Sequence, residues 1–200
     1  MNRHLLLTLL LVAPGASLVQ GCAAVVAGGA MTTATVAADQ RTTGTILDDR
    51  MIESKANDFF RADGALAQQA HLNVTSYNGM ALVVGQAPTE DLRARAVEYV
   101  SRVAKVRHVY NEVSIGTPIP TLARTNDGLV TTKVKSKLIT ISDLSSNDIA
   151  VTTEDGVVYL MGLLDQPTGD AVAEVVAGVS GVKKVVKLFE APPAAAAAPK

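Results

Sequence analysis

Apolar and polar residues in the middle of the chain follow the same pattern twice. Residues 71–85, HLNVTSYNGMALVVG, and residues 148–162, DIAVTTEDGVVYLMG, align at a constant offset of 77. In each block an alternating segment precedes Asn-Gly or Asp-Gly, and an apolar, β-branched run follows it. These dipeptides supply the positive φ values that a two-residue hairpin turn requires. Each block therefore predicts a β-hairpin.

A helical spacing of apolar residues follows each hairpin. In the first copy Thr89 is the expected N-cap, and in the second Pro167-Thr168 precedes the helix. A last strand is expected over residues 106–113 and 182–189. The apolar positions of the two expected helices are Leu92, Ala96, Val97, Val100 and Val103, and Val172, Val175, Val176 and Val179. The sequence is thus a tandem duplication of a unit of about 65 residues.

Another amphipathic helix is expected before each hairpin. Its apolar positions are Ile52, Ala56, Phe59 and Phe60 in the first copy and Val130, Val134 and Leu138 in the second. We expect Asp48/Asp49 and Asn126/Asp127 to cap these helices. The pattern predicts an α+β fold of two tandem α-β-β-α-β units. In each unit two helices cover one apolar face of a three-stranded sheet.

The N-terminus has the pattern of an export signal. A short polar start with Arg3 precedes an apolar run from Leu5 to Ala13, which is too short to span a membrane. The run leads to Val19-Gln20-Gly21-Cys22, which resembles a bacterial lipobox and contains the only cysteine. We expect cleavage before Cys22 and acylation of its sulfur; the alternative is an ordinary secreted protein with an incidental cysteine. Ala23, by resemblance to bacterial sorting rules, favours the outer membrane.

Composition divides the remaining chain. Residues 22–44 are almost uncharged and lack a clear period, and the Pro/Ala-rich residues 191–200 cannot bury a core. We therefore expect a signal peptide at 1–21, a flexible tether at 22–44, domains at 45–116 and 124–190, and a disordered tail at 191–200.

The sequence offers little for catalysis or for nucleic-acid binding. The net charge is -1, and no basic stripe is interleaved with aromatic residues. His71 and His108 fall on expected strands, and no nucleophile elbow, metal-ligand spacing or phosphate-binding loop is visible. We expect no enzyme activity, no cofactor, no metal and no nucleic-acid partner.

The repeated unit resembles the BON domain, a small module of bacterial envelope proteins. The segments that carry the resemblance are NVTSYNGMALVVGQAPTEDLRARA, VYNEV, NDGLVTTKVKSKL and VTTEDGVVYLMGL, and the likeness covers roughly residues 18–189. It implies a lipoprotein with two BON domains, anchored to the outer membrane of a Gram-negative bacterium and facing the periplasm.

The first helix of the second unit is the candidate binding site. It carries Lys133, Lys135 and Lys137, whereas its counterpart in the first unit lacks a basic bias. Lysines beside an exposed leucine suit anionic headgroups, but the residues alone favour a solvated helix face, since lysines are common there. The BON resemblance implies a role in binding anionic phospholipid for Leu129, Val130, Lys133, Lys135, Lys137 and Leu138. The family often has Trp where this chain has Leu129.

Two functional hypotheses follow. The first is a lipid-anchored, non-enzymatic protein that binds anionic phospholipid through its second domain and supports outer-membrane integrity. The second is an interaction module for envelope proteins of outer-membrane assembly or for peptidoglycan-associated factors. A subunit of a pore or ring is a weaker third reading, because no barrel-forming segment is visible.

Overall fold

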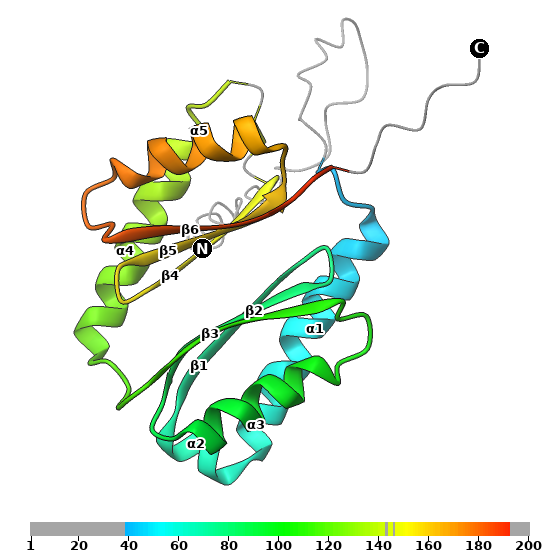
Figure 1. Cartoon of the computed structure of the whole chain (residues 1–200), viewed down its shortest axis with the longest axis vertical. Helices are drawn as coiled ribbons and strands as arrows, with labels where there is room; N and C mark the ends of the chain where they lie inside the picture. Colours follow the sequence, from blue (N-terminus) through cyan, green and yellow to red (C-terminus); the bar gives the residue numbers. More distant parts are fainter. Residues whose placement is uncertain (1–38, 143, 146, 193–200) are drawn as a thin grey trace, which may run out of the picture. The chain divides into compact units, whose positions relative to one another are not determined.

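The computed structural model describes residues 39–142, 144–145 and 147–192. The expected signal peptide, Cys22, most of the tether and almost all of the tail lie outside the described residues. Figure 1 shows the order of the elements along the chain. They are α1 (Thr43–Ala62), α2 (Gly64–Gln69), β1 (His71–Tyr77), β2 (Met80–Ala87), α3 (Glu90–Ser101), β3 (His108–Ile115), α4 (Thr121–Leu138), β4 (Ile149–Glu154), β5 (Val157–Leu163), α5 (Gln166–Ala177) and β6 (Lys184–Glu190).

Each repeat forms a three-stranded mixed sheet, as the sequence predicted. The strand orders are β1-β2-β3 and β4-β5-β6. The first two strands of each sheet are antiparallel, with Tyr77 opposite Met80 and Glu154 opposite Val157 next to the turns. The third strand pairs in parallel with the middle strand. A parallel pair needs a crossover connection, and α3 and α5 provide it.

Both predicted hairpin turns are present. Asn78 and Gly79 have φ values of 54° and 74°, and Asp155 and Gly156 have 47° and 75°. Two successive positive φ values give the turn whose twist matches that of the flanking strands. The register of both hairpins therefore follows from the local sequence.

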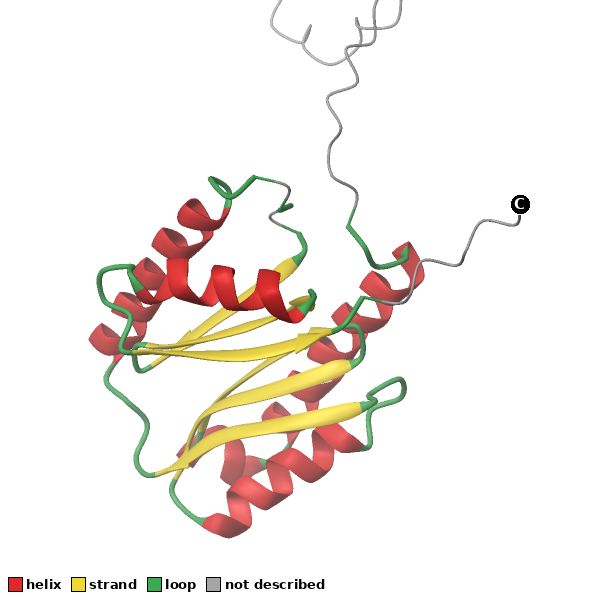
Figure 2. Ribbon diagram, turned by 45° about the horizontal axis from the view of Figure 1, so that its top comes forward, coloured by secondary structure: helices red, strands yellow, loops and turns green. Residues whose placement is uncertain are grey.

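The helices cover the outer face of each sheet (Figure 2). In the first repeat, Ile52 of α1 and Val100 of α3 meet Val83 of the middle strand in one buried cluster. The second repeat builds the matching cluster from Val130, Val134 and Leu138 of α4, Val158 and Leu160 of β5, and Val172 and Val176 of α5. Most of the apolar positions expected on these helices are buried; Val97, Val175 and Val179 are partly buried. Phe59 is 41% exposed and stacks on Tyr99.

The second face of each sheet is buried as well, which the sequence pattern did not lead us to expect. A third apolar cluster joins the two sheets and contains Tyr77, Leu82, Val84, Tyr159, Met161 and Leu163. The uninterrupted apolar run over residues 80–84 was the available signal, because a strand buried on both faces does not alternate. The two repeats thus share one core in addition to their own.

Three details of the helices differ from expectation. The helix α2, only six residues long, was too short to show a period. The first helix of each repeat begins at Thr43 or Thr121, so Asp49 and Asp127 lie inside helices and do not cap them. The helix α5 is capped by Asp165, which accepts a hydrogen bond from the Thr168 amide, whereas the expected Thr89 cap of α3 is confirmed.

Candidate functional site

The candidate lipid-binding helix α4 is held by one apolar face. Val130, Val134 and Leu138 are spaced by one turn and are at most 3% exposed. Pro120 precedes the helix and offers no side-chain cap. Packing against the sheet rather than capping therefore fixes the orientation of α4.

The six predicted site residues fall into two groups. Leu129 is 57% exposed, and Lys133, Lys135 and Lys137 are also exposed. Val130 and Leu138 are 1% and 3% exposed, so both lie in the core and can act only by positioning the helix. The structure thus presents one leucine and three ammonium groups to solvent.

Two further apolar side chains extend this surface. Leu122 is 82% exposed and lies seven residues before Leu129, which places both on one side of α4. Ile139, directly after the last residue of the helix, is 66% exposed. The spacing of Leu122 and Leu129 was visible in the sequence but was not used. We call Leu122, Leu129, Lys133, Lys135, Lys137 and Ile139 the α4 surface.

Local interactions account for part of the lysine bias. Lys135 and Lys137 lie in the last turn of α4, where a cation interacts favourably with the helix dipole. The Lys133 ammonium lies 3.5 Å from the carbonyl oxygen of Ser180. Among the described residues, none of these three lysines forms a salt bridge. Their charges are therefore available to an external anion.

The corresponding helix α1 has a different surface. Leu47 and Met51 are 55% and 53% exposed, one turn apart. Their neighbour Glu53 accepts a hydrogen bond from the Ser76 amide at 2.9 Å, and burial raises its pKa. The helix α1 carries four carboxylates against three basic residues, so the two helices share an exposed apolar side but not an excess of positive charge.

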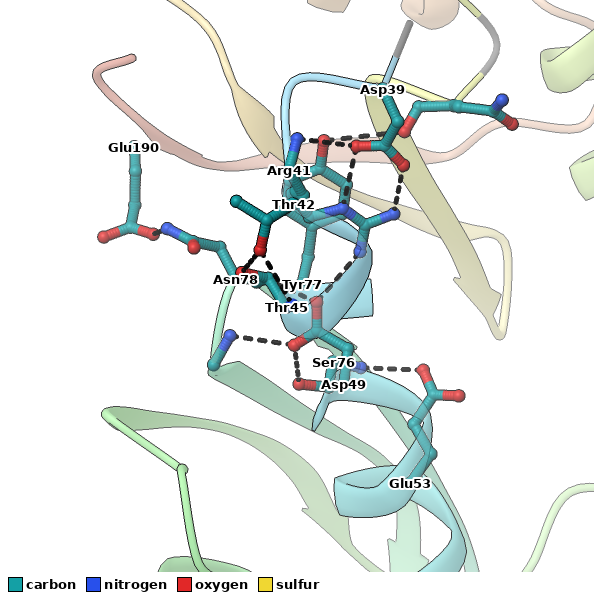
Figure 3. A network of polar contacts seen from close by, with 12 residues as sticks. Asp39, Arg41, Thr42, Thr45, Asp49, Glu53, Ser76, Tyr77, Asn78 and Glu190 are labelled. Carbon is teal, nitrogen blue, oxygen red and sulfur yellow. Dashed lines mark hydrogen bonds and ion pairs between the residues drawn. The ribbon is translucent and has the colours of Figure 1, made fainter. Parts of the chain in front are cut away.

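A polar network surrounds the hairpin turn of the first repeat (Figure 3). Asp49, which is 3% exposed, accepts hydrogen bonds from the amides of Asn78 and Gly79, both at 2.8 Å. It also accepts one from the Ser76 hydroxyl at 2.7 Å. These bonds satisfy the turn amides and fasten the hairpin to α1.

Arg41 completes this network. Its guanidinium lies 2.8 Å from Asp39 and 2.9 Å from Asp49, and it stacks over the Tyr77 ring at 3.8 Å. Burial opposes the charged forms, but these hydrogen bonds outweigh it, raising the pKa of Arg41 and lowering that of Asp39. Burial also raises the pKa of Tyr77 to about 12. The segment before α1 is thereby fixed to the first repeat.

The second repeat retains the aspartate but not the arginine. Asp127, which is 5% exposed, accepts hydrogen bonds from the amides of Asp155 at 2.9 Å and Gly156 at 2.8 Å. Sequence reasoning missed this role of Asp49 and Asp127. The signal was present, since both aspartates precede their turn by nearly the same number of residues.

The two histidines in the described part of the chain lie on different strands. His71 begins β1 and lies 3.4 Å from Arg124; burial and that charge lower its pKa. His108 makes an edge contact with Tyr110. Within residues 39–192, as far as they are described, no three His, Cys, Asp or Glu side chains could hold a metal ion. The same residues contain no helix long and apolar enough to cross a membrane.

Comparison with known proteins identifies the repeats. Residues 48–117 and 126–193 match the BON domain. The chain is 37% identical over 171 residues to the outer membrane lipoprotein DolP of Haemophilus influenzae, covering 86% of this chain and 89% of that protein. It is 36% identical over 151 residues to a 21 kDa hemolysin of Actinobacillus pleuropneumoniae, covering 76% and 78%.

A similarity to a solved structure is weak. The C-terminal domain of CdsD, a structural protein of the Type III secretion system of Chlamydia trachomatis, is 15% identical with a TM-score of 0.29. It covers 72% of this chain and 67% of that chain, and a similarity this low says nothing about function. The sequence matches agree with the two repeated α-β-β-α-β units of the structure, and the chain belongs to the BON domain family.

Proposed function

We propose that this protein is a lipid-anchored envelope protein of the outer membrane, facing the periplasm, and that it binds anionic phospholipid through α4 of its second BON domain. Cys22 carries the lipid, and the protein supports outer-membrane integrity without catalysing a reaction. The lipobox-like segment before Cys22 and the similarity to an outer membrane lipoprotein support the anchor. The α4 surface supports the lipid contact.

The observation that carries the lipid contact is the combination of exposed leucine and free lysines on α4. Each lysine beside an anionic membrane contributes about 1 kcal/mol. Burial of Leu129, which is now 57% exposed, adds part of the roughly 1.5–3 kcal/mol of a fully buried leucine. Three lysines together thus correspond to about a hundredfold in vesicle affinity. The acyl anchor keeps this surface close to the bilayer, so a weak contact suffices.

Vesicle flotation tests this proposal. The protein is residues 23–200, which lack the lipid and the apolar leader but retain every described element. The wild type is compared with Lys133→Glu/Lys135→Glu/Lys137→Glu on vesicles containing phosphatidylglycerol. A matched control, Lys55→Glu/Arg61→Glu/Lys184→Glu, makes the same change in net charge at exposed positions elsewhere.

We expect the wild type and the control to float with phosphatidylglycerol vesicles and the α4 variant to remain at the bottom. Vesicles of phosphatidylcholine alone should bind none of them. If the α4 variant floats as well as the wild type does, or if neither protein floats, the lipid contact is ruled out.

A contact with envelope proteins is the second candidate, and the exposed edge strand β3 favours it. Ile115 at the end of β3 is 49% exposed, and β3 carries no lysine to block pairing with another strand. Crosslinking in cells separates the two functions. One dominant protein partner that persists in the α4 variant supports the interaction module.

A further inference from the structure

The fold has two grooves, one beside the first helix of each repeat, and they occupy equivalent places in the two repeats. The edge strands β1 and β4 cross at Thr75 and Thr152, and a groove opens on each side of the crossing. The α1 groove lies between α1, the end of β1 and the start of β4, and includes Arg41, Asp49, Glu53 and Tyr77. The α4 groove lies between α4, the start of β1 and the end of β4, and includes His71, Arg124, Asp127, Thr131 and Glu154.

The equivalence holds residue by residue. Asp49 and Asp127 occupy the same place in their helices, and each accepts from the amides of its hairpin turn. Tyr77 and Glu154 are the last residues of equivalent strands. The α1 groove therefore shows what kind of group this architecture accepts.

The α1 groove holds a guanidinium group that comes from the short segment before α1, which bends at Gln40 and Arg41. Residues 39–42 precede α1, and Arg41 reaches from this segment to Asp49 and the Tyr77 ring. Only 12% of its side chain is exposed. A planar, weakly hydrated guanidinium suits such a buried carboxylate better than an ammonium does.

The α4 groove has the acceptors, but in the described part of the chain no guanidinium hydrogen-bonds to them. Arg41 lies eight residues before Asp49, and the residue eight positions before Asp127 is Ile119. The backbone amide of Ile119 donates a hydrogen bond to the side-chain oxygen of Gln86 at 3.1 Å. Gly128 replaces Arg50, and the open volume is about 460 Å³, against 250 Å³ in the α1 groove. The α4 groove is thus the larger and emptier of the two.

Two carboxylates face this volume. Each carboxylate oxygen of Asp127 accepts one hydrogen bond, from a backbone amide. Each carboxylate oxygen of Asp49 accepts two hydrogen bonds, and one of these four comes from Arg41. Glu154 takes the place of the aromatic ring and accepts from Gln86 at 2.7 Å. Arg124 also lines the groove, but in the described part of the chain it hydrogen-bonds to His71 and Thr121 and to neither carboxylate.

We infer that the α4 groove binds an arginine side chain presented by a segment of another protein. The guanidinium lies against Asp127 and Glu154, as Arg41 lies against Asp49 and Tyr77 in the α1 groove. The bound guanidinium thus meets two carboxylates in the α4 groove, which form charge-assisted hydrogen bonds, whereas Arg41 meets one carboxylate and one aromatic ring in the α1 groove. This contact is independent of the lipid contact, because Asp127 and Thr131 lie on the side of α4 opposite to Leu129, at about 100° per residue.

Nuclear magnetic resonance of the full chain, with Cys22→Ser to prevent acylation, tests the inference. The ligand is N-acetyl-arginine amide, and N-acetyl-citrulline amide is its uncharged control of the same shape. The amides of Asp155 and Gly156 report binding because they donate to Asp127. We expect saturable shifts of both signals with the arginine compound and none with the citrulline compound.

Variants locate the binding. Glu154→Gln should weaken arginine binding about tenfold, as expected for a hydrogen bond to a charged group. Glu174→Gln, at an exposed position of α5, should leave it unchanged. In Arg41→Ala the vacated α1 groove should bind the same compound, now reported by the amides of Asn78 and Gly79.

Three results would overturn the inference. They are the absence of saturable shifts at Asp155 and Gly156, equal shifts with the citrulline compound, and undiminished binding to Glu154→Gln. The wild-type titration decides the question even if Arg41→Ala does not fold.

Discussion

The side-chain oxygens of Thr75 and Thr152 lie 2.7 Å apart, and each of these residues is the equivalent of the other in the internal repeat. A residue that contacts its own equivalent lies on a two-fold axis. The two repeats are therefore related by an approximate two-fold axis through this threonine pair. Their contact has the form of a homodimer interface enclosed within one chain.

The threonine pair gives a prediction about coupling between the repeats. Thr75→Val or Thr152→Val leaves one hydroxyl without its partner and should lower the free energy of unfolding by about 1 kcal/mol. The double variant replaces both hydroxyls with apolar groups, so it should cost less than the sum of the two. Urea denaturation of all four proteins provides the double-mutant cycle. Additive losses would mean that the two hydroxyls are not coupled.

The two turn-binding aspartates should differ in their contribution to stability. Asp49→Ala leaves two turn amides and the Ser76 hydroxyl without an acceptor, and it removes one of the two carboxylates that pair with the buried Arg41, which keeps Asp39. We expect a loss of about 4 kcal/mol, the range found when one partner of a buried ion pair is removed. Asp127→Ala frees only two amides and should cost about 2 kcal/mol. Denaturant unfolding measures both, and a larger loss for Asp127→Ala would contradict the assignment.

Gly85 should not tolerate a side chain. Its φ is +121°, and a Cβ there would lie 1.9 Å from the carbonyl oxygen of His71 on the paired strand. Gly85→Ala should therefore destabilise the fold by at least about 3 kcal/mol, from backbone strain together with steric overlap. Gly64→Ala is the control, because nothing lies within 4 Å of its added Cβ. Thermal unfolding should show a large drop for the first variant and little change for the second.

Glu154 gives the wild type a characteristic pH dependence. Burial raises the pKa of Glu154 above its ordinary value of 4.5, so the folded state binds its proton more tightly than the unfolded state does. The contribution of this carboxyl to stability therefore falls as the pH rises through 4.5 and levels off above the raised pKa. Relative to Glu154→Gln, the wild type should lose stability over that window. Urea titrations at several pH values should show this difference; a constant difference would contradict it.

An aromatic residue at position 129 should strengthen the proposed lipid contact. Leu129→Trp places a ring that favours the membrane interface at a side chain that is 57% exposed. We expect several-fold tighter binding to phosphatidylglycerol vesicles with unchanged thermal stability. Leu47→Trp is the matched control, at 55% exposure on α1. An equal gain for both variants would mean that any exposed tryptophan suffices.

The fold was largely predictable because its decisive signals are local. The turn at Asn78-Gly79, the spacing of Val130, Val134 and Leu138, and the cap at Thr89 each depend on a few neighbouring residues. The duplication then showed each signal twice.

The long-range contacts could not be read from the sequence. Arg41 and Asp49 meet because α1 begins earlier than the caps suggested, and Thr75 meets Thr152 only once both sheets are formed. The exposure of Leu129 depends on the rotation of α4, which packing against the sheet determines. Of the proposed site, the lysines were visible in the sequence, whereas the separation of exposed from buried residues was not.

The apolar cluster between the two sheets has a consequence during synthesis. A ribosome produces the first repeat before the second, so Leu82 and Val84 have no cover until residues 149–190 have been made. For that interval the nascent chain exposes an apolar strand surface of the kind that aggregates or recruits chaperones. Truncation after the first repeat would make this transient exposure permanent.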